Sequence, residues 1–67
     1  MKLLNIKRSD YFDCTVGKVV TIYSELTKGQ LEDITEDLKE LGYDIVTYGV
    51  KTREFENRNS IVIIERR

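Results

Sequence analysis

The sequence of 67 residues contains no histidine, no proline and no tryptophan, and its only cysteine is Cys14. Histidine and cysteine commonly serve as general bases, nucleophiles and zinc ligands. One thiol without histidine cannot build a zinc site, and no histidine is present to activate Cys14 as a nucleophile. The sequence therefore indicates a binding protein without metal or other cofactor, and not an enzyme.

The chain also lacks the devices that usually stabilise a small domain. Its length predicts a single domain, residues 1–67, whose one core barely offsets the conformational entropy lost on folding. Cys14 cannot form an internal disulfide, so self-association is the remaining way to bury more surface. We therefore expect a homodimer.

Long apolar segments are absent as well. The longest uninterrupted run of aliphatic residues, 61–64, is too short to span a bilayer. The first eight residues do not contain the apolar stretch of a secretory signal. A single cysteine is typical of a reducing compartment. Together these features predict a soluble, cytoplasmic protein that does not enter a membrane.

Charge is nearly balanced over the whole chain, with a net of −1, but it is unevenly distributed. Between Glu25 and Asp44, seven acidic residues stand against two lysines, a net of −5. The rest of the chain holds nine basic and five acidic residues, a net of +4. We expect one acidic element on a mildly basic body.

A helix is the clearest element of the sequence. Thr27 and Gln30 have the spacing of a capping box, in which each side chain hydrogen-bonds the other residue's backbone N–H. Gly42 suits the left-handed residue that follows a helix. These signals predict a helix over residues 28–41. Between them, apolar residues recur at spacings of three and four and mark a single face: Leu31, Ile34, Leu38 and Leu41.

Strand-forming residues flank this helix on both sides. A short run at 3–7 and longer runs rich in β-branched and aromatic residues predict four strands, the longer ones at 18–24, 44–52 and 60–66. The polar stretch 54–59 is expected to form a turn, and the apolar run within the last strand predicts a central position. The order β-β-α-β-β predicts an α+β fold. Its four-stranded, mainly antiparallel sheet has the order 1-2-4-3, with the helix packed on one face.

One helix cannot cover both faces of such a sheet. Val20 and Ile22 point to one face of their strand, and Val19 and Tyr23 point to the other, so neither face is clearly polar. An uncovered apolar face is typical of an interface. Two possibilities remain open: the free face forms the homodimer contact, or residues 9–17 fold over it.

The acidic residues of the helix form the first candidate site. Three pairs of like charges stand four residues apart in the predicted helix, and each costs about 0.2–0.5 kcal/mol. Such a face is either a solvated surface that keeps a small protein soluble or a docking surface for a partner protein with a basic surface. The predicted partner-binding residues are Glu32, Asp33, Glu36, Asp37 and Glu40.

The basic C-terminal part offers a second candidate site, for nucleic acid. Proteins that bind single strands combine cations for the phosphates with aromatic side chains for the bases. Interspersed glutamates weaken this hypothesis, because nucleic-acid-binding domains are usually strongly basic. The candidate residues are Tyr48, Lys51, Arg53, Arg58 and Arg66.

No family motif is recognised in the chain. In size and style, as a short proline-free α/β chain with an acidic helix, it resembles the accessory proteins of phages and other viruses. Many of those bind and block one host or defence protein, so the resemblance implies an inhibitor. The leading hypothesis is a non-enzymatic protein-binding module. The alternative is a small nucleic-acid-binding or transcription-associated protein that uses the hairpin 51–67.

Overall fold

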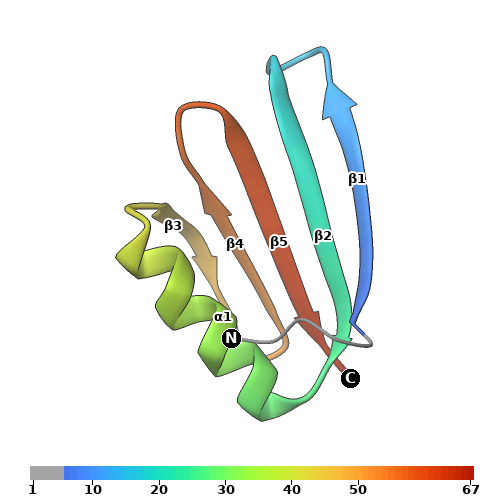
Figure 1. Ribbon diagram of the computed structural model, residues 1–67, viewed down its shortest axis with the longest axis vertical. Helices are drawn as coiled ribbons and strands as arrows, with labels where there is room; N and C mark the ends of the chain where they lie inside the picture. Colours follow the sequence, from blue (N-terminus) through green and yellow to red (C-terminus); the bar gives the residue numbers. More distant parts are fainter. Residues whose placement is uncertain (1–5) are drawn as a thin grey trace.

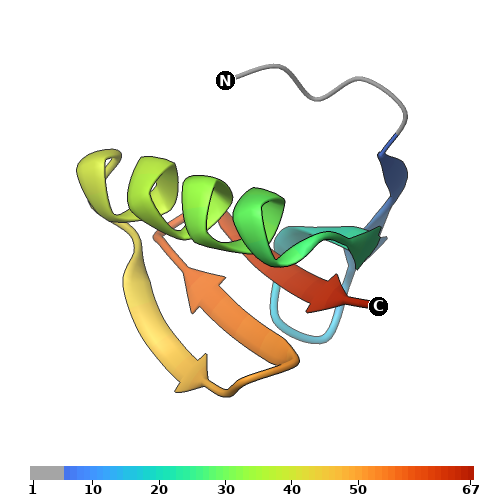
Figure 2. The ribbon, with the colours of Figure 1, turned by 90° about the horizontal axis from the view of Figure 1, so that it is seen from below.

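The computed structural model describes residues 6–67. Its five strands form one mixed sheet in the order β1-β2-β5-β4-β3, and the single helix packs on one face (Figure 1 and Figure 2). Only β2 and β5 run parallel; the other neighbours are antiparallel. The elements in chain order are β1 (Lys7–Asp13), β2 (Lys18–Leu26), α1 (Lys28–Glu40), β3 (Asp44–Tyr48), β4 (Thr52–Glu56) and β5 (Ser60–Arg66).

The sheet differs from the predicted one in both strand number and strand order. The prediction of four mainly antiparallel strands in the order 1-2-4-3 is wrong, because stretch 44–52 is not one strand. A turn divides it at Gly49, whose N–H donates to the carbonyl oxygen of Thr52 at 3.0 Å. A side chain at Gly49 would meet that same oxygen, because a Cβ there would lie 2.7 Å from it. The extra hairpin reverses the chain once more, so β5 runs parallel to β2.

The turn predicted over 54–59 is wrong in its first half. Residues 54–56 belong to β4, and the side chain of Phe55 is fully buried there. Glu54 and Glu56 flank Phe55 and point to the opposite face, because side chains alternate along a strand. The true turn follows, where the side-chain oxygen of Asn57 accepts from the N–H groups of Asn59 and Ser60 at 2.9 and 2.7 Å.

The first strand also differs from the prediction. Residues 3–5 of the predicted strand 3–7 lie outside the described residues, and the strand in the structure runs from Lys7 to Asp13. It pairs antiparallel with β2 at one edge of the sheet. The possibility that residues 9–17 cover a sheet face is therefore wrong. The first part of that segment lies within the sheet, and the rest forms the turn into β2.

The helix agrees closely with its prediction, because both of its ends are set by local hydrogen bonds. The N–H of Gln30 donates to Thr27 Oγ1 at 3.1 Å, and the N–H of Thr27 donates to Gln30 Oε1 at 2.9 Å. At the other end Gly42 adopts φ 87°, and its N–H donates to the carbonyl oxygen of Lys39 at 3.1 Å. These bonds satisfy backbone groups that a helix end leaves without partners.

Variants at the two caps should destabilise the protein by different amounts. Thr27→Ala removes one side-chain acceptor and should lower the free energy of unfolding by about 1 kcal/mol. Gly42→Val should cost more, because a β-branched residue resists the positive φ of this position. Gly29→Ala, inside the helix, is the control and should be neutral or stabilising by up to about 1 kcal/mol. Urea denaturation measures all three; equal stability of Gly42→Val and the parent would contradict the assigned helix end.

The main core lies between α1 and the near face of the sheet. In Figure 1 the helix lies toward the β3 edge, so the β1 edge is left without a covering layer among the described residues. Phe55 and Ile64 are fully buried under the helix. The members of the core cluster are Leu26, Leu31, Ile34, Leu38, Phe55, Val62 and Ile64. The strand that the apolar run predicted as central, β5, is the middle strand of the sheet.

The far face of the sheet has no second layer within residues 6–67 (Figure 2). Strand register places Val20 there, between Tyr11 of β1 and Ile61 of β5. These neighbours leave Val20 only 2% exposed, and Ile22 and Ile63 on the same face are half-buried. The twisted sheet thus hides much of this apolar strip by itself.

Candidate functional site

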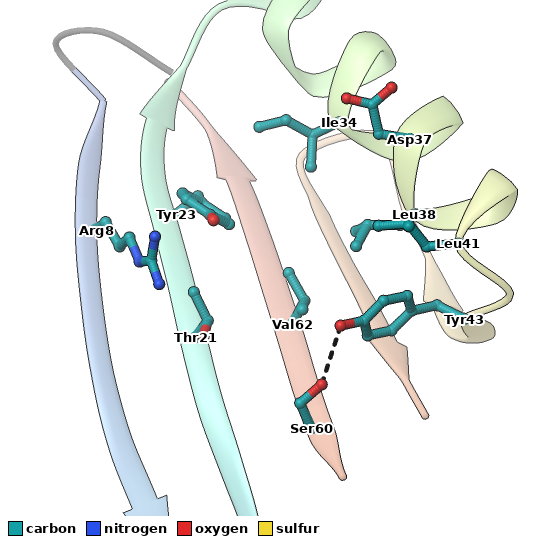
Figure 3. A pocket seen from close by; sticks show the side chains of 10 residues that line it. All are labelled: Arg8, Thr21, Tyr23, Ile34, Asp37, Leu38, Leu41, Tyr43, Ser60 and Val62. Carbon is teal, nitrogen blue, oxygen red and sulfur yellow. Dashed lines mark hydrogen bonds between the residues drawn. The ribbon is translucent and has the colours of Figure 1, made fainter. Parts of the chain in front are cut away.

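A groove of about 300 Å³ runs between α1 and the near face of β1, β2 and β5 (Figure 3). It exists because the helix sits toward the opposite edge of the sheet. Tyr43 and Ser60 stand at one side of the groove, with their side-chain oxygens 3.0 Å apart. Its lining is mainly apolar, with side chains from the helix, the residue after it and the strands: Tyr23, Ile34, Leu38, Leu41 and Val62.

Opposite charges stand on the two rims of this groove (Figure 3). On the β1 rim, Arg8 is already engaged: its Nε donates to Asp10 Oδ1 at 3.1 Å, and its guanidinium lies 5.7 Å from the ring centre of Tyr23. The hydrogen bond from Arg8 holds the pKa of Asp10 below its ordinary value and raises the pKa of Arg8. On the helix rim, Asp37 forms no ion pair with another described residue.

The helix turns the predicted partner-binding acids in different directions. Asp37 lines the groove, whereas Glu32 faces β4 and is bound there by Arg53. Residues three and four apart are neighbours on a helix, so Asp33 and Glu40 stand next to Asp37. The free negative charge of the helix therefore gathers along the rim of the groove and on the solvent side. The acids fully on that exposed side are Asp33, Glu36 and Glu40.

Arg53 occupies a buried polar network rather than a binding surface. It is only 7% exposed, and its Nε donates to the carbonyl oxygen of Gly49 at 2.9 Å. One terminal nitrogen donates to Thr35 Oγ1 at 3.0 Å, and the other to Glu32 Oε1 at 3.1 Å. The guanidinium also stacks on the ring of Tyr48, 4.1 Å from its centre. Glu32 and Arg53, which the sequence assigned to two competing sites, thus bind each other.

The other residues of the predicted nucleic-acid site do not share one surface. Lys51 and Arg66 lie together at one end of the sheet, where the N–H of Arg66 donates to the carbonyl oxygen of Lys51 at 2.8 Å. Arg58 lies in the turn between β4 and β5, at the other end of those strands. The ring of Tyr48 is in contact with the guanidinium of Arg53. The structure therefore brings together pairs of these residues, but not the whole set.

The groove residues on the strands were missed by sequence reasoning. Arg8 and Tyr23 belong to β1 and β2, and β1 was not predicted in its true position. Their shared face follows from the register, in which Arg8 pairs with Tyr23. The apolar stripe of the helix shows which side of it packs on the sheet, but not where across the sheet the helix lies. That position depends on the number of strands beneath the helix, so the stripe could not show that α1 leaves this strand pair uncovered.

Other kinds of site have little support in residues 6–67. This part of the chain contains no group of three or more metal-ligating side chains. Cys14 is exposed in the turn between β1 and β2. The one helix described is neither long nor apolar enough to cross a membrane.

The chain matches none of the protein-family models with which it was compared. Searches of the curated proteins and of the solved structures find no match either. The groove and the charges around it are the features of the molecule that bear on its function.

Proposed function

We propose that the protein is a non-enzymatic protein-binding module that holds an apolar, positively charged segment of its partner in the groove between α1 and β1–β2. The observation that carries this proposal is the acidic helix rim beside an apolar floor. Burying apolar side chains of the partner removes apolar surface from water and so favours the complex. Lysine or arginine residues next to them would meet Asp37 and its acidic neighbours.

The two components of the groove would have different roles. The exposed apolar surface, including Leu41 at 73% exposure, would provide most of the affinity. The acidic rim would speed association with a basic partner and set the orientation of the bound segment. An inhibitor of the kind implied by the chain's size and style would act by covering a basic functional surface of its partner.

A nucleic-acid-binding role has less support. The guanidinium of Arg53 is bound to Glu32 within the protein, and Arg58 lies at the opposite end of the sheet from Lys51 and Arg66. The acidic helix would also repel phosphates. The nucleic-acid hypothesis remains a prediction, and Arg58→Glu tests it without disturbing the network of Arg53.

Two synthetic peptides test the proposed groove. One alternates leucine with lysine, and the other alternates leucine with glutamate at the same length. In an NMR titration, the leucine–lysine peptide should shift the signals of Tyr23, Leu38 and Leu41, and its affinity should fall with added salt. Asp37→Lys should weaken this binding at least roughly tenfold, because attraction becomes repulsion across the contact. The leucine–glutamate peptide should bind much more weakly.

Glu65→Lys is the matched control, because it makes the same charge change at an exposed position on β5. It should leave the affinity for the leucine–lysine peptide close to that of the parent. Equal losses in Asp37→Lys and Glu65→Lys would show that only net charge matters. Absence of shifts in the groove with either peptide would overturn the proposed site.

We further propose that the protein forms a homodimer, since its core is small and its single cysteine cannot form an internal disulfide. Two surfaces are available for this contact: the far face of the sheet and the edge strand β1. Sedimentation at micromolar to millimolar concentration tests self-association. A mass of about 7.9 kDa throughout that range would exclude it.

A further inference from the structure

The sheet has two edges, and they differ in how well each could pair with another strand. At one edge, β3 has five residues and its pairing with β4 is interrupted by a shift in register between Ile45 and Thr47. At the other edge, β1 has seven residues and pairs with β2 without interruption. Irregular, short edges resist pairing with another chain, whereas long regular ones invite it. The backbone groups on the outer side of β1 have no strand partner within the described residues.

Exposure also favours β1 over the far face of the sheet as a contact. On β1, Tyr11 is 51% exposed and Phe12 is 60% exposed, on opposite faces of the strand. On the far face, Val20 is only 2% exposed. Large exposed aromatic side chains are typical of the centre of an interface. An interface along β1 would bury both Tyr11 and Phe12, whereas Val20 in the middle of the far face is already covered.

The charge order along β1 is complementary to itself. Two basic residues, Lys7 and Arg8, precede Ser9, and the acidic Asp10 follows it. When two copies of such a strand run antiparallel with Ser9 at the centre, Arg8 of each copy falls opposite Asp10 of the other. Lys7 falls opposite the uncharged Tyr11. Charges of opposite sign that face each other across two paired strands stabilise the pair, and charges of the same sign in that position destabilise it.

We propose that a second copy of this chain pairs with β1 in an antiparallel, two-fold arrangement centred on Ser9. The two sheets become one continuous sheet, and Arg8 and Asp10 of both copies form a ring of alternating charges. Phe12 extends the core cluster across the contact, because Ile6 packs against that cluster. The opposed residues are Ser9 with Ser9, Arg8 with Asp10, Lys7 with Tyr11 and Ile6 with Phe12 of the second copy.

Neighbouring registers are less favourable. An arrangement centred on Asp10 places the two Asp10 carboxylates directly opposite each other and Arg8 opposite Phe12. One centred on Tyr11 leaves Asp10 opposite Phe12 and the charge of Arg8 beyond the paired segment. Registers whose two-fold axis falls between two residues are excluded, because opposed side chains must lie on the same face of the sheet. Of these three registers, only the one centred on Ser9 places Arg8 of each copy directly opposite Asp10 of the other.

Two charge variants test the contact when they are mixed. In a homodimer of Arg8→Asp, the new aspartate of each copy faces Asp10 of the other, and in a homodimer of Asp10→Arg, the new arginine faces Arg8. Each variant should therefore self-associate at least roughly tenfold more weakly than the parent. An equimolar mixture places Asp opposite Arg at both positions and should restore the parent's affinity as a heterodimer. Sedimentation gives the affinities, and native mass spectrometry identifies the mixed pair. Each variant chain has like charges at positions 8 and 10 within itself, so rescue can come only from the contact between chains.

General attraction between oppositely charged proteins is controlled by a second pair of variants. Arg58→Asp and Asp44→Arg change the net charge equally but lie outside β1, so both should dimerise like the parent, alone or mixed. Register is tested by Ser9→Cys in a Cys14→Ser background, which should cross-link readily under mild oxidation because the opposed Cβ atoms lie about 4.5–5.5 Å apart. Tyr11→Cys in the same background should cross-link much less.

This inference rests on the proposed self-association, and the outcomes separate the two. A monomeric parent would overturn both. A dimeric parent whose Arg8→Asp and Asp10→Arg variants dimerise normally would overturn the β1 contact and leave the homodimer standing. A mixture no tighter than its components, or a dimer in which Ser9→Cys fails to cross-link, would overturn the Ser9 register.

Discussion

Phe55→Ala should lower the free energy of unfolding by about 3–5 kcal/mol. Phe55 is the largest of the fully buried side chains and lies beneath α1, beside Val62 on the neighbouring strand. Its removal would leave a cavity that the helix and strands could refill only in part. Domains of this length have a total stability of about 3–10 kcal/mol, so the variant should be largely unfolded near room temperature.

Phe12→Ala provides the matched control, because it truncates the same side chain on a strand where it is 60% exposed. We expect a change within about 0.5 kcal/mol when urea denaturation is done at a concentration too low for self-association. Phe55→Leu keeps most of the side-chain volume and should lower the free energy of unfolding by less than Phe55→Ala. It replaces Phe55→Ala in the comparison if that variant does not fold at all. Similar losses for Phe55→Ala and Phe12→Ala would show that β4 does not pack beneath the helix as described.

The helix could be predicted because its signals are local. The capping box joins Thr27 to Gln30, and the glycine turn at Gly42 joins residues of the last helical turn. Neither bond depends on the number of strands or on where the helix lies. The boundaries were therefore correct to one residue, with α1 ending at Glu40 and Leu41 as its C-cap.

The sheet could not be predicted to the same degree, because its topology depends on one turn. The sequence predicted one strand over 44–52, whereas the close approach of Gly49 to Thr52 makes a hairpin there. The following strand, β4, has one apolar side chain, Phe55, between two glutamates, and this pattern gives only a weak strand signal. Because this turn was missed, both the predicted number of strands and the predicted direction of the last strand were wrong.

The candidate site was predictable as a list of charges but not as a shape. The acidic residues lie on the helix as expected, yet the groove beside Asp37 requires that α1 leave β1 uncovered. Sequence spacing also could not show that Glu32 turns toward β4. Its partner Arg53 shares a strand face with Phe55, and this spacing of two residues was the available sign that Arg53 points toward the core.

Arg53→Ala should lower the free energy of unfolding by about 2–4 kcal/mol. Hydrogen bonds from a charged group contribute about 1.5–3 kcal/mol, and stacking of a guanidinium on an aromatic ring adds about 0.5–2 kcal/mol. The variant loses the contact with Tyr48 and leaves the carbonyl oxygen of Gly49 without the hydrogen bond from Arg53. Glu32→Gln should cost less than about 1 kcal/mol, because the side chain of Glu32 is 50% exposed and water screens its charge.

Arg58→Ala is the control for Arg53→Ala, since Arg58 is exposed in a turn and should change stability by no more than about 0.5 kcal/mol. The comparison separates the two roles that an arginine in this hairpin could have. If Arg53 is structural, Arg53→Ala melts at a lower temperature, and Arg53→Lys recovers little, because an ammonium cannot reproduce the planar fork that contacts Thr35 and Glu32. Equal stability of Arg53→Ala and Arg58→Ala would instead free Arg53 for a ligand and restore the nucleic-acid hypothesis. The stability of these variants therefore bears on function before any partner is identified.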